Sequence, residues 1–132
     1  MPPVPIYGEP DGLVGQLVEE LRSQSFVSNG ELVSSANAIF IKASGPWYRV
    51  ALDAGTVHWT KQDNEPLSWE VPENGWSYPH RDIGYELGLV GAKLLSLRTS
   101  QEGEAIRVEL TFSNGKRLLL VNHNDSSSYH VA

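Results

Sequence analysis

The chain has 132 residues, 40 % of them hydrophobic and 20 % charged, with a formal net charge of -6 and no cysteine. This length predicts one domain, residues 1–132, and the composition excludes a disordered chain, a disulfide framework and thiolate chemistry. The first residues, MPPVPIYGEP, lack the basic and apolar regions typical of a signal peptide, and no apolar run is long enough to cross a membrane, so we expect a cytoplasmic protein.

The first predicted elements are an extended N-terminal segment and a helix. Residues 1–10 carry four prolines, and Asp11 is a suitable N-cap for a helix over residues 11–24. Gly12 and Gly15 weaken this helix, so it should be stabilised by packing on a sheet. A helix on a membrane surface is the rival interpretation, but the polar face has no basic cluster. The apolar face consists of Leu13, Val14, Leu17, Val18 and Leu21.

Three β-rich segments follow, at residues 38–43, 47–53 and 56–61. Their short connections predict an antiparallel meander. In the middle segment the alternation predicts a core face made by Tyr48, Val50 and Leu52.

Residues 63–86 are acidic and aromatic, with six acidic residues against one arginine, a local charge of -5. Three prolines favour a long loop with one short strand near residues 67–71. Residues 87–99 fit a helix or a strand, and Gly88 and Gly91 favour a turn followed by a strand at residues 93–99. A polar loop at residues 122–128 and a strand at residues 129–131 end the chain.

Residues 105–122 predict a β-hairpin, because apolar and polar residues alternate over residues 106–113 and Asn114 and Gly115 lie between two apolar runs. A two-residue type I′ turn would place Leu110 opposite Leu119 and leave Leu118 on the second face, under the helix. The predicted fold is therefore α+β: the N-terminal helix packed on a mostly antiparallel sheet of about six or seven strands, with this hairpin central.

No motif for a metal, a nucleotide or another cofactor is present, and the four histidines lack metal-ligand spacing. His80, Arg81 and Asp82 form the most polar cluster beside aromatic residues. A histidine next to a carboxylate supports acid–base chemistry, but neighbouring loop residues point in different directions and also fit a surface turn.

The acidic, aromatic segment is the better candidate for function, since Trp and Tyr anchor protein interfaces and carboxylates steer a basic partner and repel nucleic acid. The alternative is a solvated face with the tryptophans in the core. The candidate partner-binding residues are Asp63, Glu65, Trp69, Glu70, Glu73, Trp76, Tyr78, Asp82 and Glu86.

Four stretches, WYRVALDAGTVHW (47–59), LVGAKLLSLR (89–98), VELTFSNGKRLLLV (108–121) and SYHV (128–131), resemble segments of small bacterial proteins. Some of these are similar to immunity proteins of polymorphic-toxin or contact-dependent inhibition systems. The resemblance implies a non-enzymatic antitoxin that masks the active site of a cognate toxin, often a basic nuclease. It also implies that the candidate carboxylates imitate phosphate charge and that Trp69, Trp76 and Tyr78 act as apolar anchors.

Two other interpretations stay open. One is a small-ligand or enzyme domain whose pocket lies near His80 and Asp82, and a concave pocket lined by these residues and by tryptophan would favour it. The other is an accessory domain that only dimerises.

Overall fold

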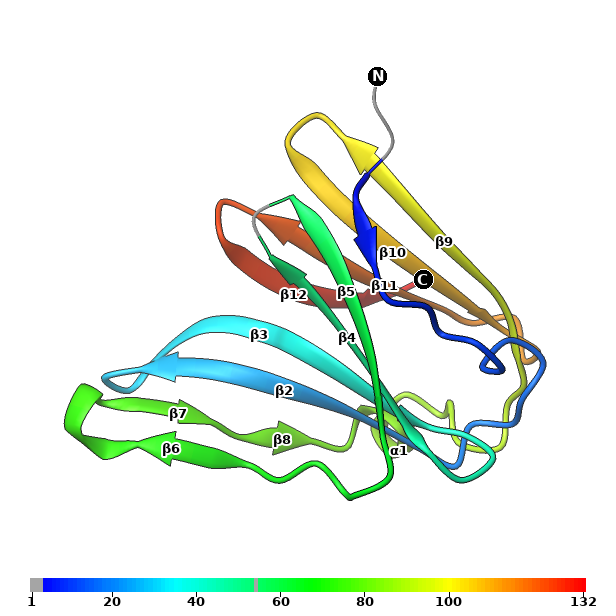
Figure 1. Cartoon of the computed structure of the whole chain (residues 1–132), viewed down its shortest axis with the longest axis horizontal. Helices are drawn as coiled ribbons and strands as arrows, with labels where there is room; N and C mark the ends of the chain where they lie inside the picture. Colours follow the sequence, from blue (N-terminus) through cyan, green and yellow to red (C-terminus); the bar gives the residue numbers. More distant parts are fainter. Residues whose placement is uncertain (1–3, 54) are drawn as a thin grey trace.

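In a computed structural model, which describes residues 4–53 and 55–132, the chain folds into two β-sheets (Figure 1). The first has eight strands in the order β1-β5-β4-β3-β2-β7-β6, with β8 also paired to β2, and the second has four in the order β12-β11-β10-β9. The strands of the first sheet are β1 (Ile6–Tyr7), β2 (Glu20–Ser28), β3 (Glu31–Lys42), β4 (Trp47–Asp53), β5 (Thr56–Gln62), β6 (Trp69–Val71), β7 (Trp76–Tyr78) and β8 (His80–Arg81). Those of the second are β9 (Leu94–Glu102), β10 (Ala105–Phe112), β11 (Arg117–His123) and β12 (Ser126–Val131).

The core lies between the two sheets, where alternate residues of each strand meet. The predicted core face of β4 is confirmed, since Tyr48, Val50 and Leu52 are all buried there. The second sheet supplies the matching side chains, Leu94, Ile106, Val108, Leu110, Phe112, Leu118 and Leu120. The antiparallel meander of β3, β4 and β5 is also confirmed. The protein is therefore a two-sheet β structure.

The α+β prediction is wrong, because residues 11–24 do not form a helix. Gly12 and Gly15 adopt positive φ angles of 83° and 95°, which interrupt a right-handed helix. The backbone instead pairs with residues 91–94: Gly15 N donates to the Leu94 carbonyl and Val18 N to that of Ala92. Leu13 and Val18 of this irregular segment and Leu21 of β2 are buried in the core, whereas Val14 and Leu17 of the predicted apolar face are exposed.

Within the described residues, helical structure is limited to a short 3-10 turn, η1 (Pro72–Asn74), and to α1 (Ile83–Glu86). No helix of this part of the chain combines the length and apolar character needed to span a membrane. The extended N-terminal segment predicted at residues 1–10 contains β1, which pairs in parallel with β5 at Val57 and His58. Residues 1–3 of this segment lie outside the described part of the chain.

The predicted C-terminal hairpin is confirmed as β10 and β11, the two inner strands of the second sheet. Its register is shifted by one residue, because the loop has three residues: Phe112 N donates to Lys116 O, and Gly115 adopts a φ of 87°. Leu110 therefore lies opposite Leu118, and Val108 opposite Leu120. A slip of one residue exchanges the faces of a strand, so Leu118 is core and needs no helix to cover it.

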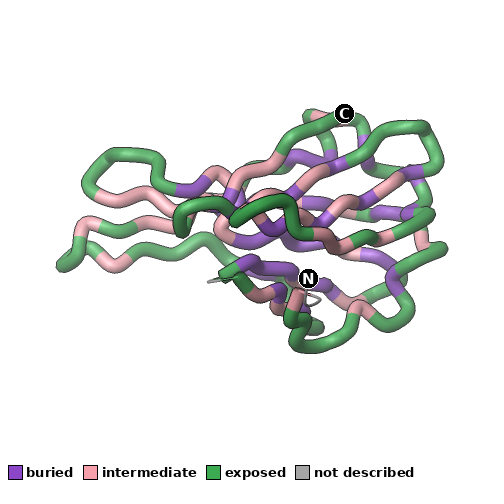
Figure 2. The backbone as a smooth tube through the Cα atoms, turned by 90° about the horizontal axis from the view of Figure 1, so that it is seen from above, coloured by how far each residue is buried: buried purple, intermediate pink, exposed green. Residues whose placement is uncertain are grey.

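Residues 63–86 are not one long loop, although the predicted short strand is present as β6. They form β6, η1, β7, β8 and α1. The β6–β7 hairpin lies beside the β2–β3 hairpin, through pairing of β7 with Val27 and Ser28. Figures 1 and 2 show these hairpins projecting together from the body of the two sheets. We call this projection, residues 26–34 and 69–78, the arm.

The predicted strand at residues 93–99 is confirmed as β9, which extends to Glu102, and the last predicted strand lies within β12. The polar loop at the end of the chain is shorter than predicted. It is reduced to a tight turn at Asn124 and Asp125, both with positive φ, because β11 continues to His123 and β12 begins at Ser126.

Candidate functional site

The arm carries a row of aromatic side chains on one face. Trp69 lies opposite Tyr78 in the β6–β7 ladder, and their rings stack with centroids 4.0 Å apart. Tyr78 also stacks on Phe26 of β2 at 5.1 Å, and Trp76 meets Phe26 edge-on. The exposed fractions of Trp69 and Trp76 are 52 % and 39 %. The structure therefore brings the three predicted aromatic residues together, and they are not core residues.

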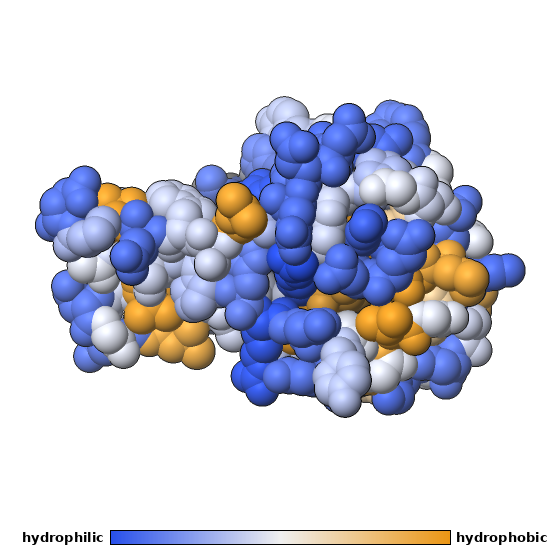
Figure 3. All heavy atoms as spheres, turned by 90° about the horizontal axis from the view of Figure 1, so that it is seen from below, coloured by the Kyte–Doolittle hydropathy of each residue, from blue (hydrophilic) through white to orange (hydrophobic). Residues whose placement is uncertain are grey.

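Phe26 belongs to this row, and the sequence analysis missed it. It is the ring between Tyr78 and Trp76, but it lies more than 40 residues before them in the chain. Leu32 and Val33, on the same arm, are also exposed, and Figure 3 shows hydrophobic side chains gathered on parts of the projection. Because side chains alternate between the two faces of a strand, Phe26 must lie on one face of β2. Nothing in the sequence around Phe26 indicates that β7 is the strand beside it.

The predicted carboxylates do not form one patch with the aromatic row. Glu70 pairs with Ser77, so it points to the opposite face of the arm from Trp69. Glu73 lies in η1 at the end of the hairpin, and Asp63 is exposed on the segment after β5. The arm contains Glu31, Glu70 and Glu73 and no Lys, Arg or His. All the formal charge of the arm is therefore negative, although Glu70 lies on the opposite face from Trp69.

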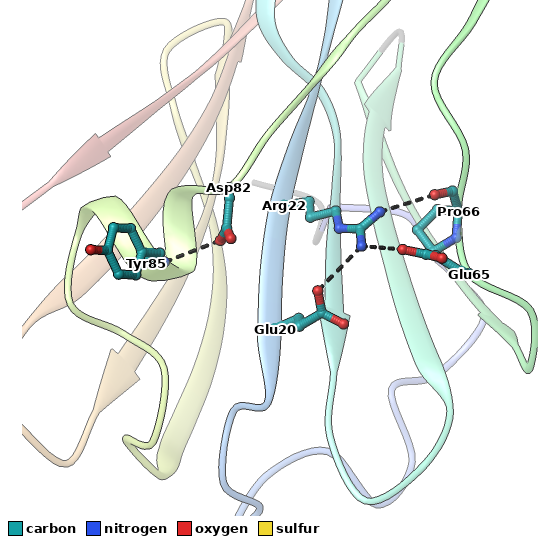
Figure 4. Close-up of polar contacts among 6 residues, drawn as sticks. All are labelled: Glu20, Arg22, Glu65, Pro66, Asp82 and Tyr85. Atoms are coloured by element: carbon teal, nitrogen blue, oxygen red, sulfur yellow. Dashed lines mark hydrogen bonds and ion pairs between the residues drawn. The ribbon is translucent and has the colours of Figure 1, made fainter.

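Glu65 is part of an ion-pair network at the base of the arm (Figure 4). Arg22 of β2 donates to Glu65, to Glu20 at 3.2 Å and to the Pro66 carbonyl at 3.2 Å. The hydrogen bond from Arg22 lowers the pKa of the Glu65 carboxyl. The Arg22 guanidinium also lies 4.9 Å from the ring of Trp47. Glu65 thus fastens the segment before β6 to the sheet, which is a structural role.

Asp82 and Glu86 also have local partners. The Asp82 side chain accepts a hydrogen bond from Tyr85 N at 3.1 Å and caps α1 (Figure 4). Glu86 accepts from Arg81 Nε at 2.7 Å in an exposed ion pair. These two residues lie beside the body, away from the aromatic row.

His80 lies on the outer face of the first sheet, paired with Gln24 of β2. Its Nε2 is 3.3 Å from Gln24 Nε2, and its ring is 5.6 Å from that of Phe40. Burial, with a smaller effect of the Arg22 charge, lowers the pKa of the imidazole.

A pocket of about 510 Å³ lies beside His80 and is also lined by Trp69 and Glu70. Asp82 is not among its lining residues, and its side chain is occupied by the helix cap. The geometry does not assemble a His80–Asp82 pair. Within the described residues there is also no group of three or more His, Asp or Glu side chains placed to hold a metal ion.

Comparisons of this chain with protein-family models, with curated proteins and with solved structures found no match.

Proposed function

We propose that this chain is a protein-binding domain that docks a basic protein partner through the arm. The observation that carries the proposal is the row of Trp69, Tyr78, Phe26 and Trp76, exposed on a projection whose formal charges are all negative.

Exposed tryptophan supports the proposal because large aromatic side chains gain most from being covered by a partner. Trp69 and Trp76 are already ordered by stacking, on Tyr78 and on Phe26, so little side-chain entropy is lost when a partner covers them. The carboxylates of the arm contribute mainly to the rate of association and to the choice of partner, since this effect of charge does not need direct contact with the aromatic row.

The partner class we propose is a basic bacterial toxin, such as a nuclease, which the domain would neutralise by covering its active site. The resemblance to immunity proteins supports this class, and the charge of the arm is complementary to a nucleic-acid-binding surface. The domain acts here without chemistry of its own.

The test is to co-express the chain with the basic toxin encoded beside its gene, and to titrate the purified proteins by calorimetry. We expect growth to be rescued and a 1:1 complex to form. Trp69→Ala and Trp76→Ala should each weaken binding by about 30-fold or more, since hot-spot truncations cost about 2 kcal/mol or more. Glu70→Gln together with Glu73→Gln should slow association and reduce its salt dependence.

Tyr85→Ala is the matched control, because Tyr85 is 81 % exposed on α1, outside the arm. It should leave the affinity unchanged. Circular dichroism of Trp69→Ala should show an intact fold, so that weaker binding reports lost contact. Absence of both binding and protection, or equal affinity of wild type and Trp69→Ala, would show that the proposal is wrong.

A further inference from the structure

Arg49 of β4 is a half-buried arginine on the outer face of the first sheet, between Phe40 of β3 and Thr60 of β5 in the cross-strand ladder. Its guanidinium carbon lies 6.0 Å from the Phe40 ring centroid. Among the described residues, no carboxylate lies within ion-pair distance of it and no hydrogen bond from its side chain is found. Burial lowers the pKa of the Arg49 guanidinium, and no neighbouring acid opposes this effect.

The other arginines are placed differently. Arg22, Arg81, Arg107 and Arg117 each contact a carboxylate within 3.2 Å, and Arg98 is exposed. Removing an arginine from water without an acidic partner is unfavourable for folding. The position of Arg49 is therefore better explained by a group that it binds than by the stability of the fold.

A pocket lies beside Arg49 because β3 and β4 separate. Their pairing ends at Ile39 and Val50, although β4 continues to Asp53 and β3 begins at Glu31. The turn between β11 and β12 closes the far side, where Ser127 N donates to Ser34 Oγ at 3.1 Å. Figure 1 shows the two strands diverging toward this turn. The small side chain of Ala51 leaves room for a pocket of about 440 Å³.

Hydrogen-bonding side chains line this pocket from four strands: Ser34, Asn37, Thr60, Asn122 and Ser127. Arg49 and Asn37 also line a second hollow of about 420 Å³, whose other walls include Phe40, Trp69 and Tyr78. Arg49 thus lies in the wall that the two hollows share. Its side chain lines both a polar and an aromatic hollow.

From this geometry we propose that the pocket between β3 and β4 binds a small organic molecule bearing one carboxylate, which the Arg49 guanidinium holds. A planar guanidinium matches a carboxylate with two parallel hydrogen bonds. The hydroxyl and amide side chains of the pocket then pair with hydroxyl or amide groups of the ligand. Asp53 and Asp125 also line the pocket, so a polyanion is repelled and a single negative charge is preferred. The proposal does not rest on docking by the arm, although Ser34 of this pocket belongs to the arm.

The experiment uses D-glucuronate and N-acetyl-L-serine as carboxylate probes, with D-glucose as the uncharged probe matched in size to D-glucuronate. Each is titrated into the full chain to about 20 mM, a range that detects millimolar affinity by NMR. At least one carboxylate probe should shift the amide signals of Ala51 and Thr60 and the Arg49 Nε signal, whereas D-glucose should not. No shift with either carboxylate, or an equal response to D-glucose, would overturn the proposal.

Two kinds of variant make the result specific. Arg49→Gln should weaken binding of the responding probe by about tenfold or more, the loss of one charge-assisted pair. Ala51→Leu keeps Arg49 and fills the pocket, so it should also abolish the shifts, whereas Ala51→Ser should preserve them. Unfolding curves check that each variant is folded. Binding by folded Arg49→Gln at wild-type affinity, or by folded Ala51→Leu, would show that the ligand lies elsewhere.

Discussion

Leu118 lies directly opposite Leu110 in the β10–β11 ladder, and both side chains are buried between the two sheets. This pair fixes which face of β11 packs into the core. We expect Leu118→Ala to reduce the free energy of unfolding by about 2–5 kcal/mol, as for other buried leucines, and Leu119→Ala to cost clearly less because Leu119 is only half-buried. Urea denaturation of the two variants measures the difference. A larger loss for Leu119→Ala would support the two-residue turn and contradict the observed register.

A substitution at Gly15 tests whether residues 11–24 form an irregular segment or a helix. Its φ of 95° is unfavourable for any residue with a Cβ, although nothing lies within 4 Å of where the Cβ would be. Gly15→Ala should therefore lower the free energy of unfolding by about 1 kcal/mol or more through backbone strain alone. In a helix the same change would raise it by about 1 kcal/mol. The sign of the shift in the urea midpoint decides between the two.

His80 should make the stability of the fold depend on pH. Its lowered pKa means that the folded state holds the proton less tightly than the unfolded state, first because of burial and then because of Arg22. The contribution is present above the ordinary histidine pKa and is lost as the pH falls through the lowered value. His80→Gln should flatten the fall in melting temperature between about pH 7 and about pH 5.

His123→Gln, at an exposed position, is the control for a histidine substitution as such. A profile for His80→Gln that falls as steeply as that of the wild type would contradict the account of His80.

Asp82 should act through its hydrogen bond and not through its charge. Asp82→Ala removes the acceptor for Tyr85 N and is expected to cost about 1 kcal/mol, whereas Asp82→Asn keeps an acceptor and should cost much less. Thermal unfolding of both variants makes the comparison. Equal losses would mean that the carboxylate charge is what matters at this position.

The strands that the sequence predicted well are those whose own alternation determines their faces. Tyr48, Val50 and Leu52 point to the core and are separated by two positions in the sequence of β4. This spacing can be recognised without knowing the neighbouring strands. The shape of the molecule depended on pairings that have no local signal. The joining of β2 to β7 brings Val27 to Ser77, across fifty residues of chain.

The errors have distinct physical causes. The apolar spacing at residues 13–21 fits a helix, but Gly12 and Gly15 have positive φ and the segment pairs with residues 91–94 instead. Leu13, Val18 and Leu21 reach the core from this backbone, whereas Val14 and Leu17 are exposed. Strands β6 and β7 of the arm have three residues each, too few to show a period. For the candidate site, the aromatic residues were found by composition. Whether a carboxylate is free to bind a partner or has a structural role depended on contacts such as that of Glu65 with Arg22, two residues that lie far apart in the sequence.

The two-residue strand β1 covers part of the edge of β5, at Val57 and His58. Tyr7 stacks on His58, Pro5 O accepts from Val57 N, and a Cβ at Gly8 would lie 2.1 Å from the Trp59 carbonyl oxygen, so the segment lies tightly against β5. Without it, the backbone groups of Val57 and its neighbours would form an open edge that another β-strand can join. The close fit at Gly8 therefore helps to hold β1 over this part of the β5 edge.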